Sequence, residues 1–394
     1  MEVKQIYTLI NSVSSEVLGK TDLVHEDLTG IVDLGNEVFN QNAVDNYVKS
    51  LVNHIGKVVF VNRPYSGKVP SVLMDAWEFG SVLEKITADV PKAEENDTWN
   101  LTDGTEYKQD VFHKPTVSAK FFNSKVTFEV PVSITERQVK ESFNSAAQLN
   151  GFLSMIYNAV EKSMTIKTDA LVMRTINNMI AETLDADKTA FGFVPSTNET
   201  VDYSSASTVR CVNLLKLYNE KTGAQLTAAT AITTPDFIRF AAYIMGLYSD
   251  RLQTISTLFN VGGKERFTPK DVLHTVLLSD FAAAAKTYLY ADTFHEDNVL
   301  LPKAETVASW QATGKDYAFE HVSKIDVKSA SGATVSVSGV LGVMFDRDAL
   351  GVTNLDKRVT TNYNAKAEFF NNYYKFDAGY FNDTNENFVV FFIA

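Results

Sequence analysis

This sequence has little cysteine, fewer basic than acidic residues and no long apolar run. Among its 394 residues, Cys211 is the only cysteine, so the chain cannot form an internal disulfide. Its formal net charge of −12 argues against a dedicated nucleic-acid-binding protein, because such a protein needs a basic face. The apolar runs are far shorter than a membrane span, and the first residues lack the apolar core of a signal peptide. We therefore expect a soluble protein of the cytoplasm with no membrane partner.

No recognised catalytic or metal-binding motif is present. The sequence has no G-x-S-x-G, no H-E-x-x-H and no zinc spacing of cysteine and histidine. Residues 261–265 contain Gly-Gly-Lys, but the P-loop spacing is missing and Glu265 stands where Ser or Thr would bind Mg²⁺, so a β-turn is the better interpretation. Cys211 lies in a segment with a helical pattern, where a small buried residue is the ordinary interpretation. We expect no catalytic residue, no cofactor and no metal site, and therefore a protein that is not an enzyme.

The longest helical pattern runs from Thr135 to Leu184, with apolar residues mostly three or four positions apart. Thr135 and Gln138 have the spacing of a capping box at its start. Asn150-Gly151 is a weak point, so we predict a short helix, a kink and then a helix from Gly151 to Leu184. At ~1.5 Å per residue, the second helix is roughly 50 Å long. One compact core cannot bury such a helix, so we expect it to extend across more than one layer.

The region before this spine helix contains several short patterns. We expect an amphipathic helix from Val3 to Val17, a second helix from Asn46 to Ile55 and a strand at 58–61. A strand with one buried face is expected at 126–132, as the partner of the strand at 58–61, and Pro131 places it at an edge or a bulge.

The stretch between these two strands is long and rich in charge and turns. A loop of this length is unusual inside a compact domain, whereas a two-stranded projection that packs on another subunit accounts for it. Trp77, Phe79 and Trp99 would then be contact anchors. A small core within the projection explains these aromatic residues equally well, so both interpretations stay open.

The second half of the chain alternates helical and strand patterns, which indicates an α/β segment. Pro235 is suited to the first turn of a helix. The apolar run at 387–393 must pair inside a sheet, because such a run promotes aggregation when it is exposed. The other elements expected are helices at 208–222, 236–251 and 282–289, and strands at 228–234, 272–278 and 339–345.

Two stretches carry a resemblance to a known family. The closing segment comprises Met344 to Val352, Asp356 to Thr361, Tyr363-Asn364 and Tyr373 to Tyr380. The second stretch is Asn46 to Val59. Together with the order of parts, they resemble the major capsid proteins of tailed bacteriophages, which share the Hong Kong 97 fold.

The resemblance implies an α+β chain with a Hong Kong 97-type capsid fold. Its parts would be an N-terminal arm, an extended two-stranded loop, a peripheral domain with the spine helix, and an axial α/β domain. The implied bounds are 1–45 for the arm, 46–56 for a short helix, 57–132 for the extended loop, 133–207 for the peripheral domain with the spine helix, 208–346 for the axial domain, 347–380 for the return to the peripheral domain and 381–394 for a final strand in the axial domain.

The implied function is mechanical. Copies would form pentamers and hexamers that close into the icosahedral head shell around double-stranded viral DNA, without sequence-specific binding. Other implied partners are a portal at one vertex and a separate scaffolding protein, because the arm is short and has no extended acidic coiled coil. The protein would be assembled in the bacterial cytoplasm and reside in the virion capsid. The alternatives are an encapsulin-like compartment shell and a cytoplasmic hydrolase with an unrecognised site.

The resemblance also suggests which residues contact a neighbouring subunit. The candidates are Arg63, Tyr65, Trp77 and Trp99 on the extended loop, and Asp356, Lys357 and Arg358 on the peripheral domain. Some members of the family cross-link a lysine of the loop to an asparagine of a neighbour's peripheral domain. The residues of suitable type and position are Lys68, Lys85, Lys92, Asn354 and Asn362, although both residue types are common in these segments.

Overall fold

The chain of the computed structural model divides into two units, each assembled from three separate segments. The first unit comprises residues 1–77, 125–172 and 352–379, and the second comprises 78–124, 173–351 and 380–394. The structure describes residues 3–20, 23–25, 30–40, 43, 46–47, 50, 69–74, 83–91, 93–107, 110, 112–135, 137, 146–195, 200–290, 304–311 and 316–394.

A four-stranded sheet with the order β1-β11-β12-β4 forms the centre of the first unit. β4 (Lys125–Thr135) pairs antiparallel with β12 (Phe369–Asn382), and β1 (Leu73–Met74) pairs parallel with β11 (Leu350–Asn364). Among the described strands β4 lies at the edge, as Pro131 predicted. The strand expected at 126–132 is therefore confirmed. Its described partner is β12, and the strand expected at 58–61 lies outside the described residues.

The helices of the first unit share one apolar core with this sheet. α1 (Val3–Leu18) confirms the amphipathic helix expected at the start, and α2 (Ile31–Asn40) follows it. Both contribute buried side chains to the cluster that also contains Val160 of α5 (Ala146–Ala186) and Tyr374 of β12. Most of the helix expected from Asn46 to Ile55 lies outside the described residues.

The spine helix α5 begins earlier than the predicted long helix. It has 41 residues and runs without a break through Asn150 and Gly151, so the predicted division into two helices at this point is wrong. An added Cβ at Gly151 would meet no atom within 4 Å, which indicates that a glycine here weakens the helix only by its propensity, about 1 kcal/mol. Thr135 is the last residue of β4, and its proposed capping partner Gln138 lies outside the described residues.

The second unit contains a five-stranded sheet with the order β5-β13-β10-β6-β7. These strands are β5 (Cys211–Asn213), β13 (Phe388–Phe392), β10 (Val340–Asp346), β6 (Leu273–Leu278) and β7 (Glu305–Val307). Every residue of β10 and β13 is buried, and the helices α6 (Leu214–Thr222), α8 (Pro235–Arg251) and α9 (Ser279–Tyr290) share an apolar cluster with them. The terminal apolar run thus pairs inside a sheet, as expected.

Two local expectations in this unit are wrong. The segment expected as a strand at 228–234 contains the short helix α7 (Ala228–Ala231), which Thr227 and Thr230 cap reciprocally. The helix expected at 208–222 begins only at Leu214, because the preceding residues form β5 and pair in parallel with β13. Cys211 is buried in that strand and not on a helix. The remaining short elements are η1 (Pro70–Val72), η2 (Asp97–Trp99), α10 (Phe319–Val322), β8 (Ile325–Lys328) and β9 (Thr334–Val337).

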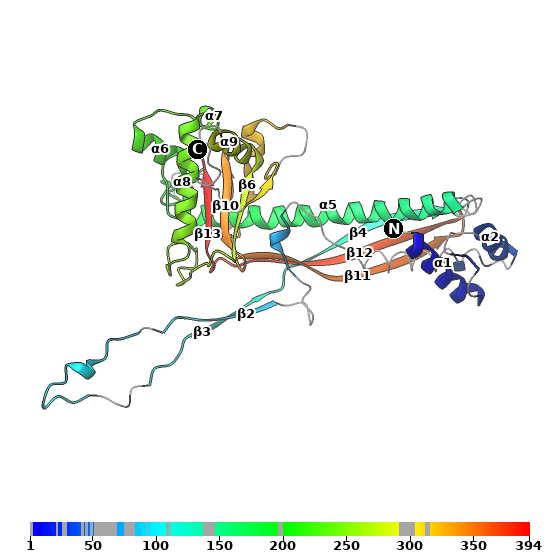
Figure 1. The fold of residues 1–394 in the computed structure, drawn as a ribbon, viewed down its shortest axis with the longest axis horizontal. Helices are drawn as coiled ribbons and strands as arrows, with labels where there is room; N and C mark the ends of the chain where they lie inside the picture. Colours follow the sequence, from blue (N-terminus) through cyan, green and yellow to red (C-terminus); the bar gives the residue numbers. More distant parts are fainter. Residues whose placement is uncertain are drawn as a thin grey trace. The chain divides into compact units, whose positions relative to one another are not determined.

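A two-stranded ribbon belongs to the second unit and continues into the long loop 89–116 (Figure 1). β2 (Leu83–Ala88) pairs antiparallel with β3 (Val117–Phe122), so the sequence-based prediction of two strands in this stretch is confirmed. No helix in the described part of the chain has both the length and the apolarity that a membrane span requires.

Candidate subunit-contact surfaces

The ribbon has two chemically different faces, because neighbouring residues of a strand point to opposite sides. The inner face carries Lys85 and, across the ladder, Lys120 and Phe122. The outer face carries Glu84, Ile86, Ala88, Val117, Ala119 and Phe121. Each residue of the outer face is exposed.

Charged side chains attach the inner face to its own unit. Lys85 Nζ lies 2.7 Å from a carboxylate oxygen of Glu386 and 3.0 Å from one of Asp383. Lys120 Nζ lies 2.9 Å from the other Asp383 oxygen, and Arg266 Nε lies 3.3 Å from Glu386. We call these five residues the foot cluster. Its two carboxylates come from the turn between β12 and β13, so the cluster joins the ribbon to the buried sheet.

The foot cluster is shielded from water, which strengthens its ion pairs. The side chain of Asp383 is 2% exposed. Burial alone would raise the pKa of Asp383, but Lys120 and Lys85 outweigh it and lower this pKa. Burial alone would likewise lower the pKa of Lys85, but Glu386 and Asp383 outweigh it and raise this pKa. Both side chains are therefore held in their charged forms.

Further contacts lie on either side of the foot cluster. The ring of Phe122 lies 5.0 Å from that of Phe381, and Lys120 Nζ lies 5.3 Å from the Phe122 ring centroid. Lys264 Nζ lies 3.5 Å from Asp89 on the loop that follows β2. Since these contacts surround the foot cluster, the base of the ribbon has a defined place in the second unit.

The loop beyond the ribbon exposes large apolar side chains. The exposed fractions are 93% for Trp99 and 86% for Phe112, and Leu101 is 66% exposed. Tyr107 is tied back by its hydroxyl, which accepts a hydrogen bond of 2.9 Å from the Thr102 amide. A small core within the projection therefore does not account for Trp99, because neither its ring nor that of Phe112 is covered.

Asp356 and Arg358, two of the predicted contact residues, lie together on β11. Arg358 Nη1 donates to Asp377 at 2.7 Å and to Asp356 at 3.2 Å. The hydrogen bond from Arg358 is the main cause that lowers the pKa of Asp377. Asp377 on β12 thus belongs to the same charged group as Asp356 and Arg358, and the sequence analysis did not identify it. Lys357 lies between the two predicted residues, and its backbone amide donates to Asp356 at 2.8 Å.

The other predicted contact residues on the extended loop, Arg63, Tyr65 and Trp77, lie outside the described residues, as does Phe79. The foot cluster was also missed, because its carboxylates lie in a turn that carries no motif beyond the sequon Asn382-Asp383-Thr384.

The foot cluster also affects whether Lys85 could form a cross-link. Amide formation needs a neutral amine, whereas the ion pairs of Lys85 keep it protonated, so Lys85 is poorly suited to it.

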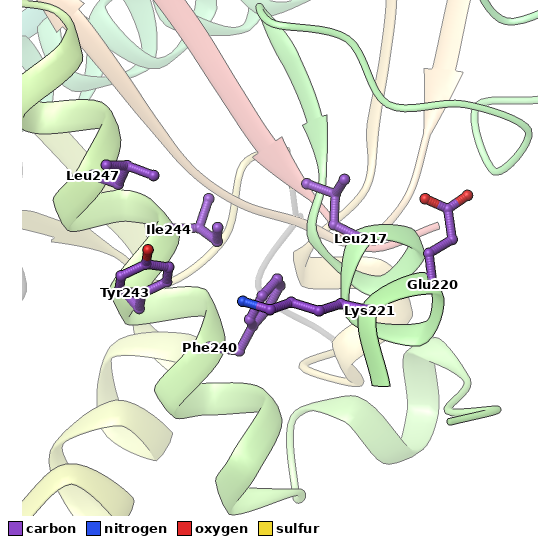
Figure 2. Close-up of a pocket in the computed structure, with 7 residues that line it drawn as sticks. All are labelled: Leu217, Glu220, Lys221, Phe240, Tyr243, Ile244 and Leu247. Carbon is purple, nitrogen blue, oxygen red and sulfur yellow. The ribbon is translucent and has the colours of Figure 1, made fainter. Parts of the chain in front are cut away.

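An open hollow of about 430 Å³ lies between α6 and α8 (Figure 2). Its lining is mostly apolar, and Lys221 Nζ lies 5.4 Å from the ring centroid of Phe240 and 5.7 Å from that of Tyr243. Glu220 at its rim is paired with Lys216 at 3.1 Å. This lining can receive an apolar side chain of a partner, but it brings together no nucleophile and base. Within the described part of the chain, no three His, Cys, Asp or Glu side chains are grouped as metal ligands would be.

Comparisons with known proteins give a consistent result. The family model of Phi29-like phage major capsid proteins matches residues 9–392. The major capsid protein of Bacillus phage B103 is 22% identical over 187 residues, which are 46% of this chain and 40% of that protein. The chain thus spans well under two thirds of the length of that curated relative.

Solved capsid structures are also similar. The fold is similar to a chain in the capsid of Staphylococcus phage Andhra, with a TM-score of 0.49 and 9% identity over 85% of this chain and 86% of that one. It is similar as well to a chain in the capsid of cyanophage P-SCSP1u, with a TM-score of 0.44 and 12% identity over 85% and 90% of the two chains.

Proposed function

This chain belongs to the family of Phi29-like phage major capsid proteins, and from that premise we propose that many copies of it form pentamers and hexamers that close into an icosahedral head shell around double-stranded viral DNA. The observation that carries the proposal is the family match over residues 9–392, because it includes both units and the ribbon. The protein is accordingly a structural component of the virion and not an enzyme in this proposal.

The exposed rings of the loop beyond the ribbon support this function. Trp99 and Phe112 remain in water in a single copy, where they add little to its stability and promote aggregation. In a shell, the same rings become buried against another copy. Aromatic side chains of this size dominate many protein interfaces.

The proposal assigns roles to the parts of the chain. Residues 57–132 are the extended loop, 133–207 and 347–380 the peripheral domain, and 208–346 with 381–394 the axial domain around the five-fold and six-fold axes. Residues 1–45 and 46–56 are the arm and a short helix. The division into two units is compatible with a peripheral and an axial part, although it places the last third of α5, from Met173 to Ala186, with the axial residues.

The proposed subunit contacts are those of the sequence analysis, namely Arg63, Tyr65, Trp77, Trp99, Asp356, Lys357 and Arg358. The net charge of −12 limits adhesion to packaged DNA, which carries the same sign of charge. A separate scaffolding protein and a portal at one vertex complete the expected partners.

Negative-stain microscopy of the purified protein tests the proposal, with and without the product of the neighbouring scaffold gene. We expect closed shells, or tubes and sheets of hexamers. A uniform small oligomer in both conditions would contradict the proposal. It would favour a cytoplasmic hydrolase and justify a search for substrates.

A shell of the same fold around an enzyme cargo, as in encapsulins, is the second candidate. The hollow between α6 and α8 is compatible with it, since it can receive an apolar side chain of any partner. The nucleic acid content of particles from infected or expressing cells separates the two. Double-stranded DNA supports the viral head, whereas a copurifying enzyme with a targeting tail supports the compartment.

A further inference from the structure

The apolar surface of α8 is wider than its own unit buries. One side of the helix contributes buried residues to the cluster that contains β13, namely Phe237, Ala241, Met245 and Tyr248. The neighbouring side lines the hollow between α6 and α8 with Phe240, Tyr243, Ile244 and Leu247 (Figure 2). Tyr243 is 56% exposed, and the other three are only partly buried. The fold of one copy accounts for the first side, whereas the second side is typical of a surface that receives a partner.

The spacing along the hollow indicates the shape of that partner. Phe240, Ile244 and Leu247 are three or four positions apart, so they form one row along α8 over about 10 Å. Leu217 of α6 lines the same hollow across from this row. A groove between helices that is lined in this way fits the apolar face of another amphipathic helix, over about two of its turns.

The charge of the hollow indicates the chemistry of the partner. The ammonium group of Lys221 lies beside the rings of Phe240 and Tyr243 and is exposed. Glu220 pairs with Lys216 at 3.1 Å, so among the residues that line the hollow Lys221 is the one whose charge has no ionic partner in the described chain. Covering an ammonium group with apolar groups alone costs free energy, whereas a carboxylate compensates for the lost water. A partner that covers the hollow therefore needs an acid beside its apolar residues.

Two helices of a second copy do not supply this combination. The exposed charged side chains of α5 are all basic, namely Lys162, Lys167 and Arg174. The charged side chain that α9 exposes is Lys286, which is also basic. Because these side chains repel Lys221, charge complementarity favours an acidic helix from a different protein.

We propose that the hollow between α6 and α8 is a docking site for an acidic amphipathic helix of a separate protein. Its apolar residues contact Ile244 and Leu247, and one of its carboxylates pairs with Lys221. The site goes beyond the proposed function, since its occupation does not depend on shell formation. Seven residues line the hollow, compared with about 20–30 residues per side in a typical stable interface, so the contact is weak and reversible.

Fluorescence anisotropy with labelled peptides tests the site on the full-length protein. The probes are peptides of about four helical turns, each held helical by a hydrocarbon staple. They carry Leu or Phe at positions i, i+3, i+4 and i+7 and glutamates beside this apolar row. One control set has the same residues in scrambled order, and a second set has lysine in place of glutamate. We expect saturable binding of the first set and little binding of either control.

Reversal of one charge tests the ion pair. Lys221→Glu should weaken binding of the glutamate peptides at least about tenfold and strengthen binding of the lysine peptides. A variant that had merely lost its fold would not gain affinity for the second set. Lys286→Glu makes the same change on the exposed side of α9 and serves as the matched control, which should bind both sets as the wild type does. Tyr243→Ser, at the most exposed ring of the hollow, should weaken binding of the glutamate peptides.

The outcomes that overturn the proposal are distinct. Absence of saturable binding by every glutamate peptide would overturn it, as would equal weakening by Lys221→Glu and Lys286→Glu. Binding to the dissociated protein that is lost on assembled particles would show that another copy covers the hollow, and would overturn the separate partner. Failure of the wild type to form shells would contradict the proposed function and leave this binding test standing.

Discussion

The five-stranded sheet and the ribbon of the second unit have opposite relations to their surroundings. Every residue of β10 and β13 is buried by the chain itself, whereas the ribbon is partly covered on its inner face and open on its outer face. The sheet is therefore complete in one copy. The apolar residues on the outer face of the ribbon are exposed in the single chain. In the proposed shell, apolar residues would thus serve stability in the sheet and association in the ribbon.

The largest expected effect distinguishes the two roles directly. Phe391→Ala, in the middle of β13, removes a fully buried ring and should lower the free energy of unfolding by about 3–5 kcal/mol. Phe121→Ala, on the outer face, should change it by less than about 0.5 kcal/mol and yet reduce shell formation. Urea unfolding of the unassembled protein measures the first quantity, and microscopy measures the second. Equal destabilisation by the two variants would abolish the distinction.

A smaller effect is expected at the foot cluster, where the two regions meet. Lys85→Met leaves Asp383 and Glu386 with less compensation for their burial. The loss should be about 2 kcal/mol, below the 3–5 kcal/mol for a fully buried pair, because the Lys85 side chain is 18% exposed. Lys120→Met is the matched control, with a side chain that is 37% exposed, and should cost at most about 1 kcal/mol. The same urea titration checks both values, and a larger loss at Lys120 would place the anchor on β3.

The foot cluster should also make stability depend on pH. The pKa of Asp383 is lower in the folded chain, so its stabilisation is present above the unfolded pKa of about 3.9 and is lost as the pH falls through the folded value. Asp383→Asn cannot lose this stabilisation with acid. The difference in unfolding free energy between wild type and Asp383→Asn should therefore be largest near neutral pH and shrink below about pH 4. A difference that stays constant with pH would show that Asp383 acts only through its shape.

The smallest effect on stability is expected at the far end of the loop. Trp99→Ala removes a ring that is 93% exposed and should change the free energy of unfolding by less than about 0.5 kcal/mol. If the ring is an interface anchor, the concentration needed for shell formation should rise. Sedimentation of assembled particles over a protein dilution series measures this, and an unchanged threshold would remove Trp99 from the proposed contacts.

The long and regular features of the fold were predictable from the sequence. The periodicity of α5, the proline at the start of α8 and the apolar run of β13 each indicate one structure, because local preference and burial agree there. The prediction of a strand at 228–234 was wrong because alanine and threonine are compatible with a strand and with a short capped helix, and the cap at Thr227 favours the helix. The prediction of a helix over the residues of β5 was wrong because this strand depends on pairing with β13, which is far away in the sequence.

The candidate contacts were predictable to a lesser degree. Trp99 could be selected because an aromatic residue in a polar projection needs an explanation. The foot cluster could not be identified from the sequence, because Lys85 and Glu386 are 301 positions apart and each looks like an ordinary surface charge by itself. The same applies to Asp377, which becomes a partner of Arg358 only when β11 and β12 are side by side.

The central place of β13 has a consequence for the time course of folding. β13 must enter between β5 and β10, and it pairs Phe391 with Val212 of a strand formed much earlier in the chain. Closing such distant pairs is slow, typically milliseconds to seconds. During this interval the run Phe388–Phe392 can pair with the same run of another chain. The yield of folded copies should thus depend on two competing rates, closure of this sheet within one chain and pairing between unfinished chains. A higher concentration of copies increases only the second rate.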